Sequence, residues 1–595
     1  MSSRNYEIED LFVIIFTGLA ILVLFAVSLA SFSIFSPWLI WLLGSFLLLW
    51  ILYLAFKSKL KIQKTDLLAV FIAVVICIFI GLFAHDNFFG RSDEGIYSNC
   101  AVYLSNHGTL KIPGDISMDG FIRAGNHSIP QFHFGYISYL AVLYSVFGVV
   151  GIKVSGSIAL FFGLCSLYFI GKRVANQNVG IWTILLLGSF YPVIWFSRTT
   201  LSEPFSLALF WFTIFCLTKL YHTDEKIFLV PAIISAWLLA LIRPEGIIIL
   251  ALFYGIVFVR RLITKKPVFN YLSILISFVF LSFYVYYSYF VQKNYLGMLE
   301  EAIFGSTINL GESNFGVLPA DAISLRLTNF VLWVFAQYHF IVYMILGTLG
   351  VVASIKRKER RWQFIVIIVL ALTSFVLVIN PGILLAQPWM LRRYIIALFP
   401  FFILGTVIFL DSFFHEGKRI KKAVVLASFL VLNLIVSRPI LAVAEFDGMR
   451  GEITKVAKLL PRDRRIYVRN YSLKEYDPSL TLLLVDGLDV KLSDNTTAMF
   501  ADFSQSAQKT AYYLIEERYV SELDLFARNY KIERTESLDI EYNSIERSGL
   551  IYKAMLPRGS WWNQASYYYA KKMTFVPSRL SHQQFNLFIY KISKI

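Results

Sequence analysis

Runs of about 20 apolar residues, separated by short basic loops, follow one another along most of the 595-residue chain. A run of roughly this length allows a helix to cross a membrane. The composition agrees, because 57% of the residues are hydrophobic and 16% are charged, whereas soluble domains carry about 25% charged residues. The pattern excludes a soluble multidomain enzyme and a disordered chain. It predicts a polytopic α-helical membrane protein.

The pattern of spans predicts three parts in the chain. Two spans lie in residues 1–66, a larger membrane module with external loops at 85–133 and 291–332 covers 67–439, and residues 440–595 carry no span. Strand-like and helical stretches alternate in the last part, which predicts a small α/β domain. We expect thirteen transmembrane helices, near residues 11–31, 35–56, 67–84, 152–171, 179–196, 203–218, 227–242, 246–259, 271–290, 333–354, 362–379, 395–412 and 422–439.

Lysine and arginine are concentrated in one alternating set of short loops. That set and the N-terminus hold 22 basic residues, whereas the opposite short loops hold Arg198, Arg243, Arg392 and Arg393. Because an excess of Lys and Arg marks the cytoplasmic side, we expect the opposite loops, the two long loops and the C-terminal domain to be extracytoplasmic, in a multi-pass protein of the plasma membrane. This distribution explains the net charge of +16 without a nucleic-acid partner.

Residues 134–150 are also apolar enough to be counted as a span. Counting them would move Lys172, Arg173 and every later basic loop to the outside. The charge distribution therefore predicts that this run lies along the membrane surface or re-enters the membrane.

Asp93 and Glu94 form an acidic pair shortly after the third expected span. Adjacent carboxylates at a membrane surface repel each other and lose hydration. Such a pair is useful if one carboxylate acts as a general base and the other binds a polar substrate. A solvated pair in a loop is the alternative interpretation.

Three further external junctions carry charged residues. Arg198 and Glu203 lie in SRTTLSEP, where a salt bridge between helix ends is the alternative to a substrate contact. Arg243 lies in LIRPEG, and the alternative there is a simple hairpin between two spans. Arg392 and Arg393 precede a late span, and paired guanidinium groups suit a lipid phosphate. Nonspecific headgroup binding is the alternative for this pair.

Metal and nucleotide motifs do not occur in the sequence. The histidines of the first external loop lack zinc-site spacing, and the glutamates of the second external loop fit a solvated helix face better than an acceptor or cation site. The cysteines support neither a disulfide framework nor a zinc cluster. No Walker, Rossmann or GxSxG motif is present, which disfavours an ATP-driven pump. The residues concerned are His85, His107, His127, His133, Glu300, Glu301, Glu312, Cys77, Cys100, Cys165 and Cys216.

In order and context, these segments resemble the polytopic GT-C glycosyltransferases, especially protein O-mannosyltransferases and lipid A aminoarabinose transferases. The acidic pair is followed by an interfacial stretch ending in Phe147 and Gly148, a span closing on GKRVA, the SRTTLSEP junction and an Arg-Arg-Tyr before a late span. The match covers residues 67–260 well and 380–400 loosely. Two extra spans precede the family's usual first span, and WWNQA at 561–565 differs from the WWDYG of oligosaccharyltransferases.

The resemblance implies a GT-C-like fold with an extracytoplasmic active site that takes a monosaccharide from a polyprenyl phosphate. It makes Asp93 the general base and Glu94 a substrate-binding neighbour. It places Glu203 at the family's second external acidic residue, and Arg392 or Arg393 at the donor phosphate. The acceptor would be a hydroxyl of a lipid, glycan or protein. No cofactor is required, although a divalent cation is compatible with the site. A single displacement with one base predicts inversion at the anomeric carbon.

Two other functions remain open from the sequence. A non-enzymatic transporter or flippase of lipid-linked glycans would line a polar path with the same carboxylates and arginines. Internal repeats and ionisable residues near span centres are typical of transporters, whereas the acidic residues here gather at span ends. A glycan polymerase or ligase would share the external arginines but transfer longer chains.

The sidedness can be tested at the end of the 134–150 run. In a background without the native cysteines, Lys153→Cys is expected to react with a membrane-impermeant maleimide added outside intact cells, because residue 153 lies at the external start of an inward-running span. Lys421→Cys serves as the control and should react only after permeabilisation. Labelling of position 153 from the cytoplasm alone would contradict the predicted topology.

Overall fold

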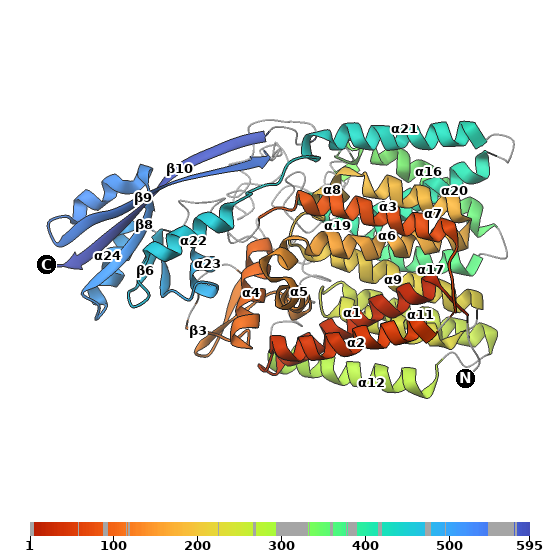
Figure 1. Ribbon diagram of the computed structural model, residues 1–595, viewed down its shortest axis with the longest axis horizontal. Helices are drawn as coiled ribbons and strands as arrows, with labels where there is room; N and C mark the ends of the chain where they lie inside the picture. The colour runs from red at the N-terminus through yellow and green to blue at the C-terminus, as the bar shows by residue number, and fades with distance from the viewer. Residues whose placement is uncertain are drawn as a thin grey trace, which may run out of the picture.

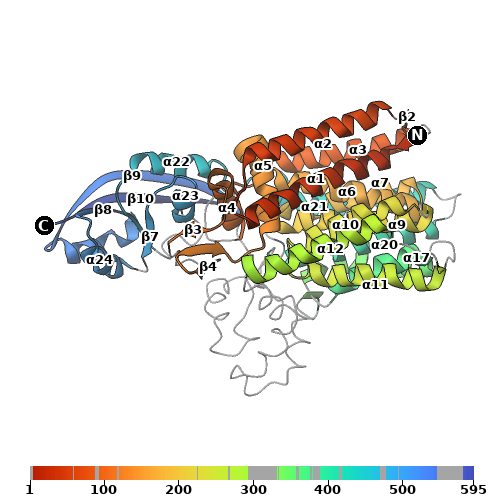
Figure 2. The same cartoon turned by 90° about the horizontal axis from the view of Figure 1, so that it is seen from below.

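The computed structural model shows a bundle of long helices with an α/β domain at one end (Figure 1). The N-terminal strand β1 (Asn5–Glu7), which pairs with β2 (Lys59–Lys61), lies at the opposite end of the bundle (Figures 1 and 2). The residues that the structure describes are 5–57, 59–86, 93–114, 116, 120–223, 225–265, 269–292, 331–332, 334–356, 361–375, 378, 389–414, 419–469, 478–493, 495–545, 576 and 580–595.

A helix coincides with each of the thirteen expected spans, except that the span at 179–196 corresponds to two consecutive helices. Among the described residues, nine helices are long and apolar enough to cross a membrane, or ten if one bent pair counts as a span. A multi-pass α-helical membrane protein is thereby confirmed, while the number of thirteen crossings stays a prediction. The helices are α1 (Ile8–Ser31), α2 (Pro37–Lys57), α3 (Lys64–Leu82), α6 (Ser155–Val174), α7 (Gln177–Gly188), α8 (Tyr191–Phe196), α9 (Ser202–Thr223), α10 (Leu229–Ala240), α11 (Gly246–Thr264), α12 (Tyr271–Tyr286), α16 (Phe340–Ile355), α17 (Arg361–Ala371), α20 (Leu398–Phe413) and α21 (Arg419–Ser437).

Helix α5 (Phe134–Lys153) is long enough to cross a membrane, but both of its ends lie at the same end of the bundle. At its start, the Phe134 amide donates to the Tyr287 hydroxyl over 2.9 Å. At its end, Lys153 Nζ lies 3.8 Å from Asp86 Oδ2. The helix lies across the bundle end that faces the α/β domain (Figures 1 and 2). This arrangement agrees with the prediction that the run does not span the membrane.

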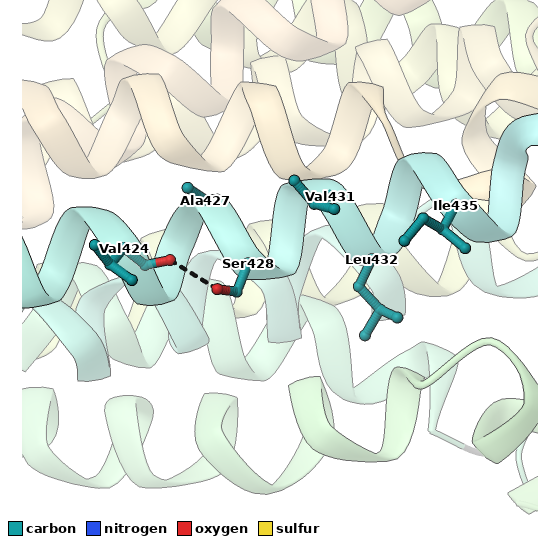
Figure 3. A pocket seen from close by; sticks show the side chains of 6 residues that line it. All are labelled: Val424, Ala427, Ser428, Val431, Leu432 and Ile435. Atoms are coloured by element: carbon teal, nitrogen blue, oxygen red, sulfur yellow. Dashed lines mark hydrogen bonds between the residues drawn. The ribbon is translucent and has the colours of Figure 1, made fainter.

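Burial separates the central helices from those on the rim of the bundle. The apolar segment of α9 is 94% buried inside the protein, whereas that of α2 is 6% buried. On the rim helix α21, a shallow apolar groove is lined by Val424, Ala427, Ser428, Val431, Leu432 and Ile435 (Figure 3). The Ser428 hydroxyl donates to the Val424 carbonyl over 2.9 Å, which satisfies it in apolar surroundings (Figure 3). These surfaces suit contact with lipid tails.

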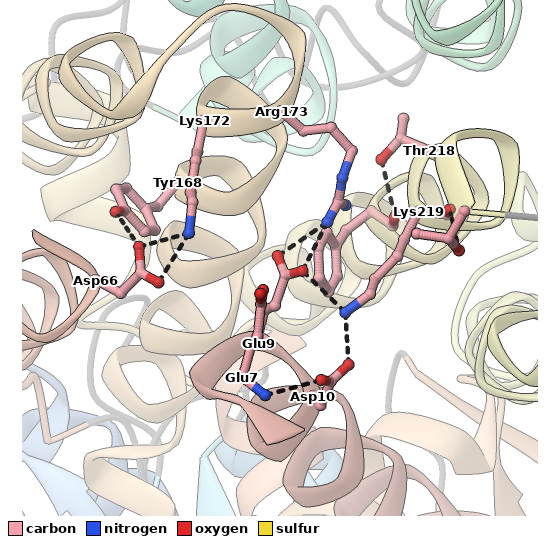
Figure 4. A network of polar contacts seen from close by, with 11 residues as sticks. Glu7, Glu9, Asp10, Asp66, Tyr168, Lys172, Arg173, Thr218 and Lys219 are labelled. Carbon is pink, nitrogen blue, oxygen red and sulfur yellow. Dashed lines mark hydrogen bonds and ion pairs between the residues drawn. The ribbon is translucent and has the colours of Figure 1, made fainter. Parts of the chain in front are cut away.

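At the end of the bundle away from the α/β domain, buried ion pairs join four helices (Figure 4). Lys172 Nζ on α6 donates to both carboxylate oxygens of Asp66 on α3 over 2.8 Å. Glu9 on α1 pairs with Arg173 on α6 and with Lys219 on α9, each at 2.9 Å. The basic residues predicted to mark the cytoplasmic side at this end are therefore also structural links between helices.

The described part of the first external loop contains a helix and a small sheet. Helix α4 (Asp93–His107) packs against α5, and a small antiparallel sheet follows it. The order in this sheet is β3 (Ile112–Pro113), β5 (His127–Pro130) and β4 (Phe121–Ala124). The loop thus forms a layer between the bundle and the α/β domain (Figure 1).

The α/β domain predicted for the C-terminal segment is confirmed. Its sheet has the order β7-β6-β8-β10-β9, in which β6 pairs in parallel with β7 and β8, and the long β10 is antiparallel to β8 and β9. Two separate apolar clusters contribute the core, one with α22 and α23 and one with α24 and η9. The elements are α22 (Met449–Leu459), β6 (Ile466–Arg469), α23 (Ser479–Leu484), β7 (Val490–Ser493), α24 (Thr496–Gln505), β8 (Thr510–Glu516), η9 (Glu517–Phe526), β9 (Tyr530–Ile545) and β10 (Leu580–Lys594).

A buried polar joint connects the bundle to this domain. The Asp86 amide donates to the Glu445 carbonyl over 3.0 Å, and Glu445 Oε1 accepts from the Ile545 amide over 2.7 Å. Glu445 Oε2 lies 3.6 Å from His85 Nδ1. Because all three polar side chains are buried, breaking these contacts would leave polar groups without water. The joint therefore holds the α/β domain against the end of α3.

The ion pairs at the N-terminal end of the bundle are expected to stabilise the fold. Glu9→Gln should lower the free energy of unfolding by about 3 kcal/mol, because Arg173 and Lys219 lose a charged partner in a buried site. Denaturant or thermal unfolding in lipid-like detergent measures this change. Glu452→Gln is the control: its partner Lys455 is exposed, and its effect should stay within about 1 kcal/mol. Equal effects of the two substitutions would contradict a structural role for Glu9.

Candidate active site

Helix α4 begins at the acidic pair and holds it at the bundle end facing the α/β domain. Asp93 and Glu94 occupy the first turn, where the helix dipole favours negative charge. The Asp93 side chain is 30% exposed, whereas Glu94 is buried. The Thr200 hydroxyl donates to the Glu94 carbonyl over 3.2 Å and accepts from Ser98 Oγ over 3.0 Å. These bonds fix α4 against the segment that leads into α9.

Arg392 links two carboxylates that are far apart in the sequence. Its Nη1 donates to Asp93 Oδ2 over 2.6 Å, and its Nε lies 3.6 Å from Glu203 Oε1. Arg392 is the first residue of α19 (Arg392–Ile395), which is bent by 59° relative to α20. Its guanidinium lies 4.6 Å from the Trp389 ring centroid. The bend thus directs Arg392 toward the acidic pair.

Arg243 and Arg393 extend this contact into a cluster. Arg243 Nη1 donates to Glu203 Oε1 over 2.8 Å, and its Nη2 lies 3.2 Å from Glu245 Oε1. Arg393 Nη1 donates to the same Glu245 oxygen over 2.6 Å. We call this set the arginine–carboxylate cluster, and its members are Asp93, Glu203, Arg243, Glu245, Arg392 and Arg393.

The charges of the arginine–carboxylate cluster are balanced, with three guanidinium groups and three carboxylates. Burial alone would raise the pKa of Glu245, but Arg243 and Arg393 outweigh it and hold that pKa below its ordinary value. Burial lowers the pKa of the neighbouring His133 to about 3, so its imidazole is neutral at pH 7. Neither group therefore disturbs the balance near neutral pH.

The structure places Arg198 apart from this cluster. Its guanidinium donates to the carbonyl oxygens of Ile440, Leu441 and Val443, the last two over 2.7 and 3.2 Å. It also lies 5.3 Å from the Phe83 ring centroid. These contacts explain Arg198 as an anchor for the segment that leads into the α/β domain. The predicted substrate contact of Arg198 stays a prediction.

Sequence reasoning missed Glu245, which accepts from two arginines in the cluster. Its interpretation as part of a hairpin was incomplete, because the hairpin also places a carboxylate between Arg243 and Arg393. The sequence feature that could have identified Glu245 is its position two residues after Arg243. Tyr97 was missed as well: it lies one turn after Asp93 on α4, and its ring contacts that of Phe132 at a tilt of 46° with a centroid distance of 4.8 Å.

Within the described part of the chain, no group of three or more His, Cys, Asp and Glu side chains is arranged to hold a metal. The carboxylates of the arginine–carboxylate cluster are engaged by guanidinium groups instead. The four cysteines are buried and free of disulfide bonds. The predicted acidic residues of the second external loop, Glu300, Glu301 and Glu312, lie outside the described residues, as does the WWNQA segment at 561–565.

The fold is that of the GT-C polytopic glycosyltransferases. The apo structure of ArnT, the lipid A aminoarabinose transferase from Cupriavidus metallidurans, matches with a TM-score of 0.50 and 12% identity, over 79% of this chain and 95% of that chain. This likeness shows the shared fold, and it confirms the GT-C-like class predicted from the sequence. No protein-family model matches the sequence, and no curated protein matches it.

Two further solved structures are similar at lower scores. ArnT from Cupriavidus metallidurans bound to undecaprenyl phosphate matches with a TM-score of 0.48 and 12% identity, over 79% of this chain and 96% of that chain. The oligosaccharyltransferase AglB from Archaeoglobus fulgidus, in complex with an inhibitory peptide and a dolichol-phosphate, matches with a TM-score of 0.45 and 10% identity. It covers 76% of this chain and 69% of that chain.

The pairing of Glu245 predicts a pH-dependent contribution to stability. Because the pKa of Glu245 is lowered in the folded protein, its contribution is full above the unfolded value of about 4.3 and is lost as the pH falls through the folded value. Glu245→Gln should therefore lower the free energy of unfolding by about 1–3 kcal/mol at pH 7. The loss should be smaller when the pH is below about 4. Unfolding curves across pH measure both effects. Glu541→Gln, which is exposed, should behave as wild type at every pH.

Proposed function

We propose that this protein is a membrane glycosyltransferase that moves a monosaccharide from a polyprenyl-phosphate donor to an acceptor hydroxyl on the extracytoplasmic side of the plasma membrane, with inversion. The observation that carries the proposal is the 2.6 Å contact between Arg392 and Asp93. It joins a guanidinium suited to a lipid phosphate and a partly exposed carboxylate suited to proton abstraction. The GT-C fold supports the same class of reaction.

The roles in this reaction follow from burial and pairing. An acceptor hydroxyl is a weak nucleophile, so Asp93 accepts its proton as the new bond forms. Glu203 is buried and paired with Arg243, which suits it to positioning rather than to proton transfer. Glu94, buried beside the base, helps to shape the substrate side of the site. Arg392 and Arg393 bind the donor phosphate and stabilise the leaving group.

The location of the cluster supports an extracytoplasmic site. It lies at the bundle end that carries the α/β domain, opposite the end where β1 and the basic residues of Figure 4 lie. The ArnT protein is known in complex with undecaprenyl phosphate and AglB with a dolichol-phosphate and a peptide, as their structures record. For this chain we propose a polyprenyl-phosphate sugar as donor and a lipid, glycan or protein as acceptor. The reaction needs no cofactor, and a divalent cation would act as an auxiliary charge.

The role of Asp93 can be measured as acceptor-dependent release of polyprenyl phosphate. Purified protein in lipid vesicles is given a panel of polyprenyl-phosphate monosaccharides and a crude acceptor extract. Asp93→Asn should reduce release by about 10²–10⁴-fold, because a neutral amide cannot accept the proton. Asp463→Asn makes the same change at an exposed carboxylate of the α/β domain and should leave release unchanged.

Each other outcome has a defined meaning. Unchanged release by the Asp93→Asn variant would retain the enzyme and discard this base. Release by wild type with retention at the anomeric carbon would overturn the single displacement. No release from folded protein, combined with movement of lipid-linked glycan across the vesicle, would favour the transporter.

A further inference from the structure

Arg392 is shared between two carboxylates, but the two contacts differ. The Asp93 contact is a hydrogen bond of 2.6 Å to a side chain that is 30% exposed. The Glu203 contact is longer, at 3.6 Å, and the Glu203 oxygen also accepts from Arg243 over 2.8 Å. Asp93 is therefore the carboxylate whose charge Arg392 chiefly balances, and it faces the accessible side of the site.

The net charge of the cluster and donor, counted before and after the proposed reaction, indicates a second role for the contact between Arg392 and Asp93. The cluster is neutral with all three carboxylates ionised, and the donor, a phosphodiester, adds one negative charge. After transfer, the released polyprenyl phosphate carries two negative charges, whereas Asp93 has gained a proton and carries none. The total is −1 before and after the reaction. The negative charge that leaves Asp93 is the charge that appears on the phosphate.

We propose that Arg392 couples these two events: it balances Asp93 before the transfer and the leaving phosphate after it. This inference rests on the proposed function. In the step, the acceptor oxygen forms the bond to the anomeric carbon and its proton moves to the Asp93 carboxylate. The bond from the anomeric carbon to the phosphate oxygen breaks, and its electron pair stays on the phosphate. As Asp93 becomes neutral, its electrostatic attraction for Arg392 weakens. The guanidinium then pairs with the dianionic polyprenyl phosphate.

Arg393 can be compared directly with Arg392. It is the next residue of α19 and makes an equally short contact, 2.6 Å, but its partner is Glu245. Glu245 does not change charge in the reaction. The attraction of Arg393 for the phosphate therefore stays the same through the reaction, whereas the attraction by Arg392 depends on the charge of Asp93. Binding experiments can separate the two arginines on this basis.

The test uses polyprenyl phosphate, the reaction product, so no turnover is required. Full-length protein in lipid nanodiscs is titrated with it as wild type, Asp93→Asn, Arg392→Gln and the double variant. Asp93→Asn should tighten binding by about tenfold, because Asp93 no longer competes with the phosphate for Arg392. The gain should disappear when Arg392→Gln is added, since coupled residues give non-additive effects.

Two controls distinguish coupling from a structural role. Arg393→Gln should weaken binding yet retain the gain from Asp93→Asn, because its own partner is Glu245. Arg392→Lys, which keeps the charge, should retain most of the gain. Thermal unfolding of every variant identifies loss of fold.

The outcomes separate this inference from the proposed function. Binding that Asp93→Asn fails to tighten, or a gain that persists without Arg392, overturns the coupling and leaves the transferase in place. Absence of polyprenyl phosphate binding in all folded variants, together with absence of release, overturns the proposed function and the coupling with it.

Discussion

Pairing of guanidinium and ammonium groups with carboxylates inside a low-dielectric bundle determines where the helices of this protein meet. In water such pairs contribute little, but a buried charge without a partner is strongly destabilising. At one end, Glu9 and Asp66 bind basic residues of α6 and α9. At the other end, Asp93 and Glu203 must both reach Arg392, so α4, α9 and α19 converge.

The two ends use the same interaction for different purposes. The ion pairs around Glu9 are buried and join helices of the bundle, whereas the arginine–carboxylate cluster joins the starts of α4, α9 and α19. The joint around Glu445 holds the α/β domain against the end of α3. The arginine–carboxylate cluster is balanced in charge and includes one partly exposed carboxylate, Asp93.

Much of the architecture could be predicted because membranes impose simple rules. Apolar length located the helices. Charge asymmetry predicts that α5 does not span the membrane, although α5 passes the test of length and composition. Alternating short elements identified the α/β domain. The number of crossings could not be derived in the same way. The short helix α7 and the bent pair α19–α20 are not single long apolar helices, so length and composition do not settle whether they cross.

The sequence by itself determined the class of fold, the uneven distribution of Lys and Arg among the loops and the residue types available at each helix junction. Only the tertiary structure decided which of those residues meet. Arg198 and Arg243 look alike as lone external arginines, yet Arg198 binds backbone carbonyls near the α/β domain and Arg243 joins two carboxylates. The reason is physical: hydropathy and charge act along one dimension, whereas a salt bridge depends on the packing angle and bend of helices far apart in the chain.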